Sequence, residues 1–220
     1  MIECRSCGAG APLDAHFCPQ CEHILPLPRQ GDYYTFFGFP RRLVLSREEL
    51  DQRFRALSRQ FHPDYFYNAP PAERLASLER SSYLNDAYRT LREPAARIEY
   101  LIGLEGLAPT KSAGEGVKVP PALLEEVFAL NEELDEIREA RESGGDSARL
   151  RNRLAAARVP VERKRDEHER KLEALSAEWD THHERRTLDA LRERMLERGY
   201  LRNLLATIDA ELVAVTNTQP

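Results

Sequence analysis

The chain has no long apolar run, no cysteine beyond residue 21 and no excess of basic residues. A transmembrane helix needs ~20 predominantly apolar residues in a row, and no stretch approaches that length. The net charge of −5 argues against nucleic acid as the main partner, because phosphate binding favours a basic excess. No secretory apolar segment precedes the first cysteine. We therefore expect a soluble intracellular protein with no membrane span.

All four cysteines lie in two closely spaced pairs, Cys4-x-x-Cys7 and Cys18-x-x-Cys21, separated by ten residues. Such pairs wrap tight turns around one ion and are typical of a closed tetrahedral S₄ site for Zn²⁺. A closed site leaves no position for a substrate, and so short a module needs its metal in order to fold. We predict a zinc-ribbon-like structural module over residues 1–30, with these ligands: Cys4, Cys7, Cys18 and Cys21.

A redox Cys-x-x-Cys site is the alternative interpretation, although two pairs at this spacing would then be a coincidence. Four cysteines complete the ligand set without histidine, so we interpret His16 and His23 as surface residues. The sequence leaves open whether the module binds a partner, promotes self-association or protects the amino terminus.

Capping signals open two helices early in the segment 31–106. Asp32 is placed to cap a short helix beginning at Tyr33. Ser46-x-x-Glu49 is a capping box, and it opens a second helix that runs to Phe61. One face of this second helix is apolar at helical spacing. The face consists of Leu50, Phe54, Leu57 and Phe61.

The remaining helices of this segment follow a turn rich in proline. Residues 65–71 include two consecutive prolines and are expected not to be helical. A third helix is predicted over 72–92, and a fourth begins at Pro94, since proline is favoured at the first helical position. The second and third helices should form an antiparallel hairpin, which Tyr34 and Phe37 close.

The tripeptide His62-Pro63-Asp64 directly follows the second helix, whose polar face carries Arg55 and Arg59. Pro63 disfavours the α conformation at His62 and so ends the helix there. A His–Asp pair can act as a general acid and base, but the sequence signals no nucleophile, pocket or metal beside it. On these three residues alone, a helix end followed by a turn is the simpler interpretation.

Residues 121–216 have the pattern of three amphipathic helices joined by short loops, which predicts an antiparallel three-helix bundle. The segment 107–120 shows no periodicity and is predicted to be a linker. The apolar stripe of the middle helix keeps its phase through Pro160, so we expect one kinked helix there. His168 lies on that stripe and is interpreted as a hydrogen-bonded core histidine. The fold class is therefore all-α.

Two large apolar residues depart from the stripe of the first bundle helix. Leu124 and Phe128 lie ~100° away from the seam formed by Leu123, Val127 and Leu130, and carboxylates follow on the same side. These residues could simply widen the buried face. The alternative is a docking surface for a partner protein, with an apolar anchor and an acidic rim.

The surroundings of His62-Pro63-Asp64 resemble a J-domain. Asp32-Tyr33-Tyr34-Thr35-Phe36-Phe37-Gly38 lies upstream, and Leu84-Asn85-Asp86-Ala87-Tyr88-Arg89-Thr90-Leu91 lies downstream. The resemblance covers about residues 32–93. It implies a short first helix, a basic second helix, a His-Pro-Asp loop and an antiparallel third helix.

The sequence beyond the J-domain has no Gly/Phe-rich linker and no repeated Cys-x-x-Cys-x-Gly-x-Gly modules, which general-purpose J-proteins have. Instead, Arg97-x-x-Tyr100-Leu101-Ile102-x-Leu104-x-Gly106 and Asn131-Glu132-Glu133-Leu134-Asp135-Glu136-Ile137 resemble the HscB family of iron–sulfur co-chaperones. This resemblance spans about residues 32–215. The tetracysteine module is similar to that of the mitochondrial members.

The resemblance implies two binding surfaces. In this family the J-domain contacts a DnaK-type chaperone, HscA or its equivalent, and promotes ATP hydrolysis. The matching residues here are His62, Pro63, Asp64, Arg55 and Arg59. The carboxy-terminal bundle holds the scaffold protein IscU, and the matching residues are Leu124, Phe128, Glu132, Glu136 and Tyr200. The chain departs from the family pattern at three positions: Tyr65, Glu125 and Ala129.

The function implied is that of a co-chaperone, not an enzyme, that delivers an IscU-type scaffold to an HscA-like chaperone and stimulates its ATPase activity. The expected location is the bacterial cytoplasm, or the mitochondrial matrix if a transit peptide was removed from a eukaryotic precursor. Two alternatives stay open. One is a J-domain co-chaperone for another client. The other is a zinc-dependent thiol redox or holdase protein, which predicts thiol chemistry and indifference to His62.

Overall fold

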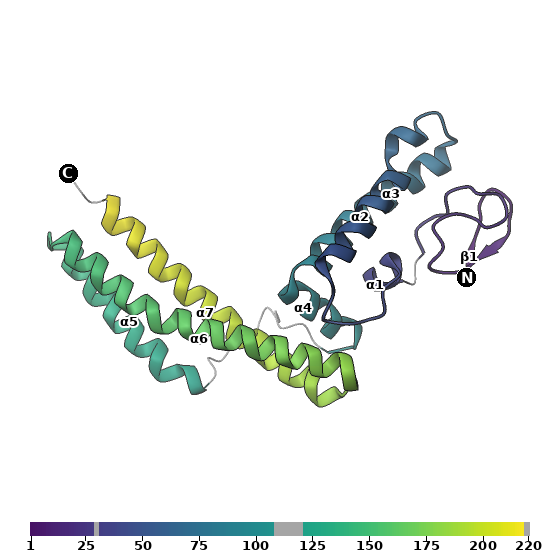
Figure 1. The fold of residues 1–220 in the computed structure, drawn as a ribbon. Coiled ribbons are helices and arrows are strands. Elements are labelled where there is room, and N and C mark those ends of the chain that lie inside the picture. Colours follow the sequence, from purple (N-terminus) through teal and green to yellow (C-terminus); the bar gives the residue numbers. More distant parts are fainter. Residues whose placement is uncertain (29–30, 108–120, 218–220) are drawn as a thin grey trace. The chain divides into compact units, whose positions relative to one another are not determined.

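The structure, a computed structural model, describes residues 1–28, 31–107 and 121–217, apart from the side chains of 121–123 and 126. The chain divides into two compact units, Met1–Leu107 and Ala108–Pro220 (Figure 1). Most of the linker predicted over 107–120, and the side chain of Leu123, lie outside the described residues. The all-α fold class expected from the sequence is confirmed.

The first unit begins with a small module built on two short antiparallel strands. Strands β1 (Ile2–Glu3) and β2 (Gly10–Ala11) pair with Ile2 opposite Ala11. An isolated bridge joins Phe17 to Ile24 farther along. The core of the module is very small, and its buried members are Ile2, Cys4, Ala11, Cys18 and Leu25. So little apolar burial cannot by itself offset the entropy lost when the segment orders.

Two of the helices of the first unit begin at capping residues, as predicted. Helix α1 (Tyr33–Phe37) follows Asp32, whose side chain accepts a hydrogen bond from the backbone N–H of Thr35. Helix α2 (Arg47–Phe61) follows Ser46, whose hydroxyl accepts from the N–H of Glu49. Each cap satisfies one of the N–H groups that the first helical turn leaves without an intrahelical partner.

The hairpin of α2 and α3 (Pro71–Arg92) is packed through a narrow apolar seam. Phe61 and Leu84 are fully buried, and Phe54 stacks on Tyr88 with ring centroids 4.1 Å apart. Tyr34 is also fully buried and lies against this hairpin from α1. The expectation of an antiparallel hairpin closed by the first helix is confirmed.

The prediction for residues 65–71 was wrong at both ends. A 3₁₀ turn, η1 (Pro63–Phe66), forms directly after α2, and Pro71 is already the first residue of α3. Proline has a fixed φ near the helical value, and at the start of a helix its missing N–H costs nothing. Helix α4 (Pro94–Leu104) begins in the same way and completes the unit.

The second unit consists of α5 (Pro121–Glu142), α6 (Ser147–His182) and α7 (Arg185–Asn217). Helix α6 continues through Pro160 without a break, as expected. The three helices share a core in which the buried residues are Leu130, Leu134, Ile137, Leu150, Leu154, Ile208 and Val215. Beyond this core α6 and α7 continue without α5, as a two-helix arm (Figure 1). His168 is buried in this arm, and its Nε2 lies 2.7 Å from the backbone oxygen of Arg194, as predicted.

None of the helices in the described ranges 1–28, 31–107 and 121–217 has the length and apolar character that a membrane crossing requires.

Candidate functional site

The four cysteine sulfurs converge on one point. The Sγ atoms of Cys4 and Cys21 are 3.6 Å apart, as are those of Cys7 and Cys18. All four lie within 4.8 Å of one another. Four sulfurs placed about 2.3 Å from a Zn²⁺ ion make a tetrahedron with edges of about 3.8 Å. The cluster therefore has the dimensions of an S₄ metal site and forms a possible metal centre.

Two turns of matching geometry present these sulfurs. In the first turn, the N–H of Gly8 donates to the carbonyl of Cys4; in the second, the N–H of Glu22 donates to that of Cys18. Gly8 and Glu22 occupy the same left-handed conformation, with φ of 74° and 61°. The backbone N–H of Gln20 points at the sulfur of Cys18 from 3.4 Å. This hydrogen bond favours the thiolate of Cys18, which is the form of the side chain that binds a metal.

His16 is not the surface histidine that the sequence suggested. Its ring lies edge-on to Phe36 and Phe61, with centroids 4.9 and 5.0 Å away. Burial, and secondly the charge of Arg80, lower the His16 pKa to about 4. The neutral ring accepts a hydrogen bond at Nδ1 from Arg80, over 2.8 Å. His23 does lie at the surface, where its Nε2 is 3.6 Å from a carboxylate oxygen of Glu73.

Arg80 of α3 is a functional candidate that the sequence reasoning missed. Its side chain is almost completely buried, and it donates hydrogen bonds to the carbonyl oxygens of Leu25, Ala15 and Pro26, at 2.7, 3.3 and 3.1 Å. A signal was available, because Arg80 occupies the same buried stripe of α3 as Leu84, Ala87 and Leu91. A charged residue on an apolar stripe indicates a specific buried partner.

The turn His62-Pro63-Asp64 is rigidly anchored and yet open to solvent. The backbone of His62 ends α2 with φ −59° and ψ 125°. Its Nδ1 accepts from the N–H of Asp64 at 3.3 Å and lies 3.5 Å from the Asp64 carboxylate. The side chains are 52% and 86% exposed. Imidazole and carboxylate are thus held together on a surface, an arrangement suited to contact with another protein.

The side chains around this turn are also exposed. Arg55 and Arg59 lie on the solvent side of α2, and two tyrosines of the following turn, Tyr65 and Tyr67, are three-quarters exposed. Inside the hairpin, the carbonyl oxygen of Phe61 accepts hydrogen bonds from the hydroxyls of Ser77 and Ser81. These two bonds tie the end of α2 to α3 directly before the turn.

The structure exposes three of the four candidate docking residues of α5. Phe128 is 64% exposed, and Leu124 is partly buried. The side chains of Glu132 and Glu136 are exposed, and Glu136 accepts from Arg153 of α6 at 2.6 Å. Tyr200 of α7 is partly buried. Because Leu130 and Leu134 form the core seam, an exposed phenylalanine here does not serve packing within the bundle.

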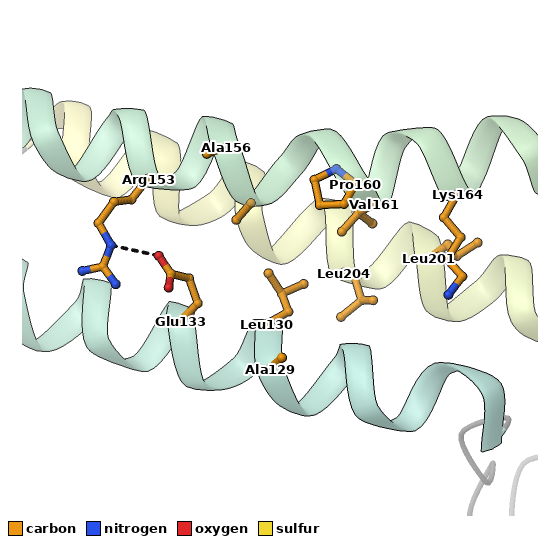
Figure 2. A pocket seen from close by; sticks show the side chains of 11 residues that line it. Ala129, Leu130, Glu133, Arg153, Ala156, Pro160, Val161, Lys164, Leu201 and Leu204 are labelled. Carbon is orange, nitrogen blue, oxygen red and sulfur yellow. Dashed lines mark hydrogen bonds and ion pairs between the residues drawn. The ribbon is translucent and has the colours of Figure 1, made fainter.

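Beside this face lies a groove of about 480 Å³ between α5, α6 and α7, which the sequence did not indicate (Figure 2). Arg153, paired with Glu133 at 2.8 Å, lies at one end, and Lys164 lies at the other. The walls between the ends offer apolar contacts, from Ala129, Leu130, Ala157, Pro160, Val161 and Leu204. Several lining residues are alanines (Ala129, Ala156 and Ala157), whose single methyl groups do not fill the space between the helices.

Comparison with known proteins gives a consistent result. No protein-family model matches the sequence. The crystal structure of the human co-chaperone protein HscB matches with a TM-score of 0.70 and 24% identity, over 95% of this chain and 98% of the human one. The fold is that of HscB. The chaperone HscB from Vibrio cholerae matches with a TM-score of 0.61 and 25% identity, over 84% of this chain and 99% of the other. The resemblance to HscB drawn from the sequence motifs is thereby confirmed.

Proposed function

We propose that this protein is a co-chaperone of iron–sulfur cluster assembly. It delivers an IscU-type scaffold protein to a DnaK-type, HscA-like chaperone and stimulates the ATPase activity of that chaperone. The observation that carries the proposal is the likeness to HscB across nearly the whole chain. The J-domain-like hairpin and the three-helix bundle are both included in that match, so both binding functions are expected together.

The first unit supplies the chaperone contact. His62 and Asp64 are exposed at the end of α2, with Pro63 partly buried between them, and Arg55 and Arg59 share the solvent side of α2. A basic face beside a fixed turn complements an acidic surface on the ATPase partner. Binding that is tighter to the hydrolysing state shifts the partner toward that state. The protein itself then needs no catalytic group.

The second unit supplies the scaffold contact. Phe128 and Leu124 would be the apolar anchors, Glu132 and Glu136 the acidic rim, and Tyr200 a further contact from α7. Large apolar side chains that are exposed on an otherwise charged helix are typical of interface anchors. Holding scaffold and chaperone on one chain raises the effective concentration of one at the other.

The metal we propose for the cysteine cluster is a structural Zn²⁺. Four thiolates in tetrahedral arrangement suit zinc and leave no open coordination position. Cys4, Cys7, Cys18 and Cys21 would hold the ion, and the energy of binding would fold a module whose apolar core is too small to do so alone.

The test is a single-turnover ATPase assay with a DnaK-type chaperone, in the presence and absence of an IscU-type scaffold. The native chain should accelerate hydrolysis, and His62→Gln should abolish this effect without changing the far-UV circular dichroism. His182→Gln, at an exposed position near the end of α6, is the matched control and should behave as the native chain.

Two results would contradict the proposal. One is equal stimulation by the native chain and by His62→Gln. The other is a native pull-down that recovers neither an IscU-type scaffold nor a DnaK-type chaperone. Thiol-dependent activity that survives His62→Gln would instead support the redox or holdase alternative. We propose the cytoplasm of a bacterium as the location, or the mitochondrial matrix for a processed eukaryotic precursor.

A further inference from the structure

The contacts of Arg80 join two parts of the first unit that are distant in sequence. Arg80 belongs to α3, and its three carbonyl acceptors belong to residues 15–26, which follow or flank the second cysteine pair. His16 accepts a fourth bond. The guanidinium of Arg80 therefore makes four hydrogen bonds to the tetracysteine module.

The burial of this guanidinium makes the contact energetically important. Arg80 is 1% exposed, and burial lowers its pKa to about 10. A buried charge is tolerated only where hydrogen bonds replace its hydration. The polar partners found in the described part of the chain are carbonyl oxygens and an imidazole, which are fixed in place only while the module is folded. The module and the buried state of Arg80 therefore stabilise each other.

The same junction encloses the residue that precedes the His-Pro-Asp turn. Phe61 has no exposed surface, and its ring contacts His16 and Phe17 of the module. The guanidinium carbon of Arg80 lies 5.6 Å from the centre of the same ring, within the range of a cation–π contact. The last turn of α2 is therefore packed between α3 and the module, one residue before His62.

We propose that Arg80 is a positioning residue that couples metal binding by the tetracysteine module to the geometry of the His62-Pro63-Asp64 turn. The inference rests on the proposed function, in which this turn contacts the chaperone. Metal holds the module folded, the module holds Arg80 and Phe61 in place, and Phe61 fixes the end of α2. Coupling of this kind is reciprocal: whatever disturbs Arg80 must also weaken the retention of metal.

The first test uses the native sequence and needs no substitution at Arg80. Backbone amide NMR spectra of the full chain are compared with and without bound Zn²⁺. Removal of Zn²⁺ should shift the amide signals of residues 61–65 and increase their hydrogen exchange, while α4 is unaffected. Unchanged signals at residues 61–65 would overturn the proposal, whatever the chaperone does.

The second test is a double-mutant cycle. Arg80→Met in the Zn²⁺-loaded chain should shift the amide signals of residues 61–65, and it should speed the transfer of Zn²⁺ to a chromophoric chelator about tenfold, within the range typical of coupled sites. The same substitution in a Cys4→Ser, Cys21→Ser background should leave the amide signals of residues 61–65 almost unchanged, because the module is already unfolded in that background. A residue that only stabilises α3 predicts equal effects in both backgrounds, and that result would overturn the proposal.

Two further variants sharpen the cycle. Arg74→Met replaces an exposed arginine of the same helix and should change neither Zn²⁺ transfer nor the turn. Arg80→Lys keeps the charge without the planar fork of donors, so it should restore part of the lost Zn²⁺ retention. If Arg80→Met fails to fold, Arg80→Lys takes its place in the cycle, with a smaller effect of the same sign.

The chaperone assay separates this proposal from the proposed function. Arg80→Met should raise the concentration of co-chaperone needed for half-maximal ATPase stimulation about tenfold, with the maximum preserved. An unchanged half-maximal concentration would overturn the link to the turn. A native chain that fails to stimulate the ATPase at all would contradict the co-chaperone function. The amide NMR spectra and the rate of Zn²⁺ transfer would still show whether metal binding is coupled to the turn.

Discussion

The two units differ in whether they bury arginine side chains. In the first unit, Arg80 and Arg97 are buried and donate to main-chain carbonyls, including that of Leu91. In the second unit no arginine of the described residues 121–217 is buried, and several pair with carboxylates in partly exposed positions. Arg138 and Arg141 share Glu211 there.

This difference determines how each unit responds to change. A buried arginine bonded to carbonyls fixes the path of two separate segments, so its loss leaves acceptors without partners. A surface ion pair contributes little, because water replaces either partner. The first unit is therefore interlocked across its module and hairpin, whereas the stability of the second comes mainly from its apolar seam. The predictions below test this contrast, from the largest effect to the smallest.

The largest effect should follow from removing the metal ligands of the first unit. In Cys4→Ser with Cys21→Ser, the module loses a binding energy of roughly 10 kcal/mol, so residues 2–25 should unfold. Helices α2 to α7 should persist. NMR dispersion of the module amides and far-UV circular dichroism report the two outcomes separately. A module that stays folded in this variant would show that its small core suffices without metal.

In the second unit, Leu124→Ala with Phe128→Ala should weaken binding of an IscU-type scaffold by about 4 kcal/mol, at about 2 kcal/mol for each anchor. The cost in unfolding free energy should stay below about 1 kcal/mol, because Phe128 is exposed and Leu124 is only partly buried. Calorimetric titration and a denaturant melt separate the two quantities. Normal binding by a variant that melts early would make both residues part of the packing instead.

The contrast between the arginines is itself measurable. Arg97→Met should destabilise the first unit by about 2–3 kcal/mol. Arg198→Met breaks a half-exposed pair with Glu169 and should cost the second unit less than about 1 kcal/mol. The single tryptophan, Trp179, lies in the second unit, so its fluorescence follows that unit in urea while circular dichroism follows both. An equal loss of unfolding free energy in Arg97→Met and Arg198→Met would contradict the proposed difference between the two units.

The smallest expected effect is a gain. Glu22 adopts a positive φ that its counterpart Gly8 tolerates freely. Glu22→Gly should therefore stabilise the module by about 1 kcal/mol and slow the transfer of Zn²⁺ to a chelator. Glu3→Gly, in the extended strand β1, is the control and should bring no such gain. Faster transfer from Glu22→Gly would mean that the carboxylate, and not the backbone, matters at this position.

Local signals predicted much of this structure correctly. Helix starts were found from Asp32 and Ser46, whose caps act within three residues. The continuity of α6 followed from the stripe that keeps its phase through Pro160. The cysteine cluster followed from spacing alone, because two Cys-x-x-Cys turns have few other uses. Such features depend on neighbours in the sequence, which is why a single chain reveals them.

The features that were missed depend on contacts between distant segments. His16 and Arg80 are 64 residues apart in sequence. The periodicity of a helix does not indicate which other segment packs against it, so the contact between the tetracysteine module and α3 was not predicted. The groove between α5, α6 and α7 depends equally on the separation of these helices, which the sequence does not specify. The roles of the turn and of the α5 face stay predictions, because they concern partner proteins.

The two-helix arm has a consequence for how this protein can vary. Along an antiparallel pair, each layer of side chains contacts only the layers next to it, so the pair behaves as a repeating spacer. Deleting seven residues from α6 between His168 and Trp179, and seven from the facing part of α7, would shorten the arm by about 10 Å. The three-helix core and the face of Phe128 would keep their sequence and their packing. Length in this arm is thus a quantity that selection can adjust independently of what the bundle binds.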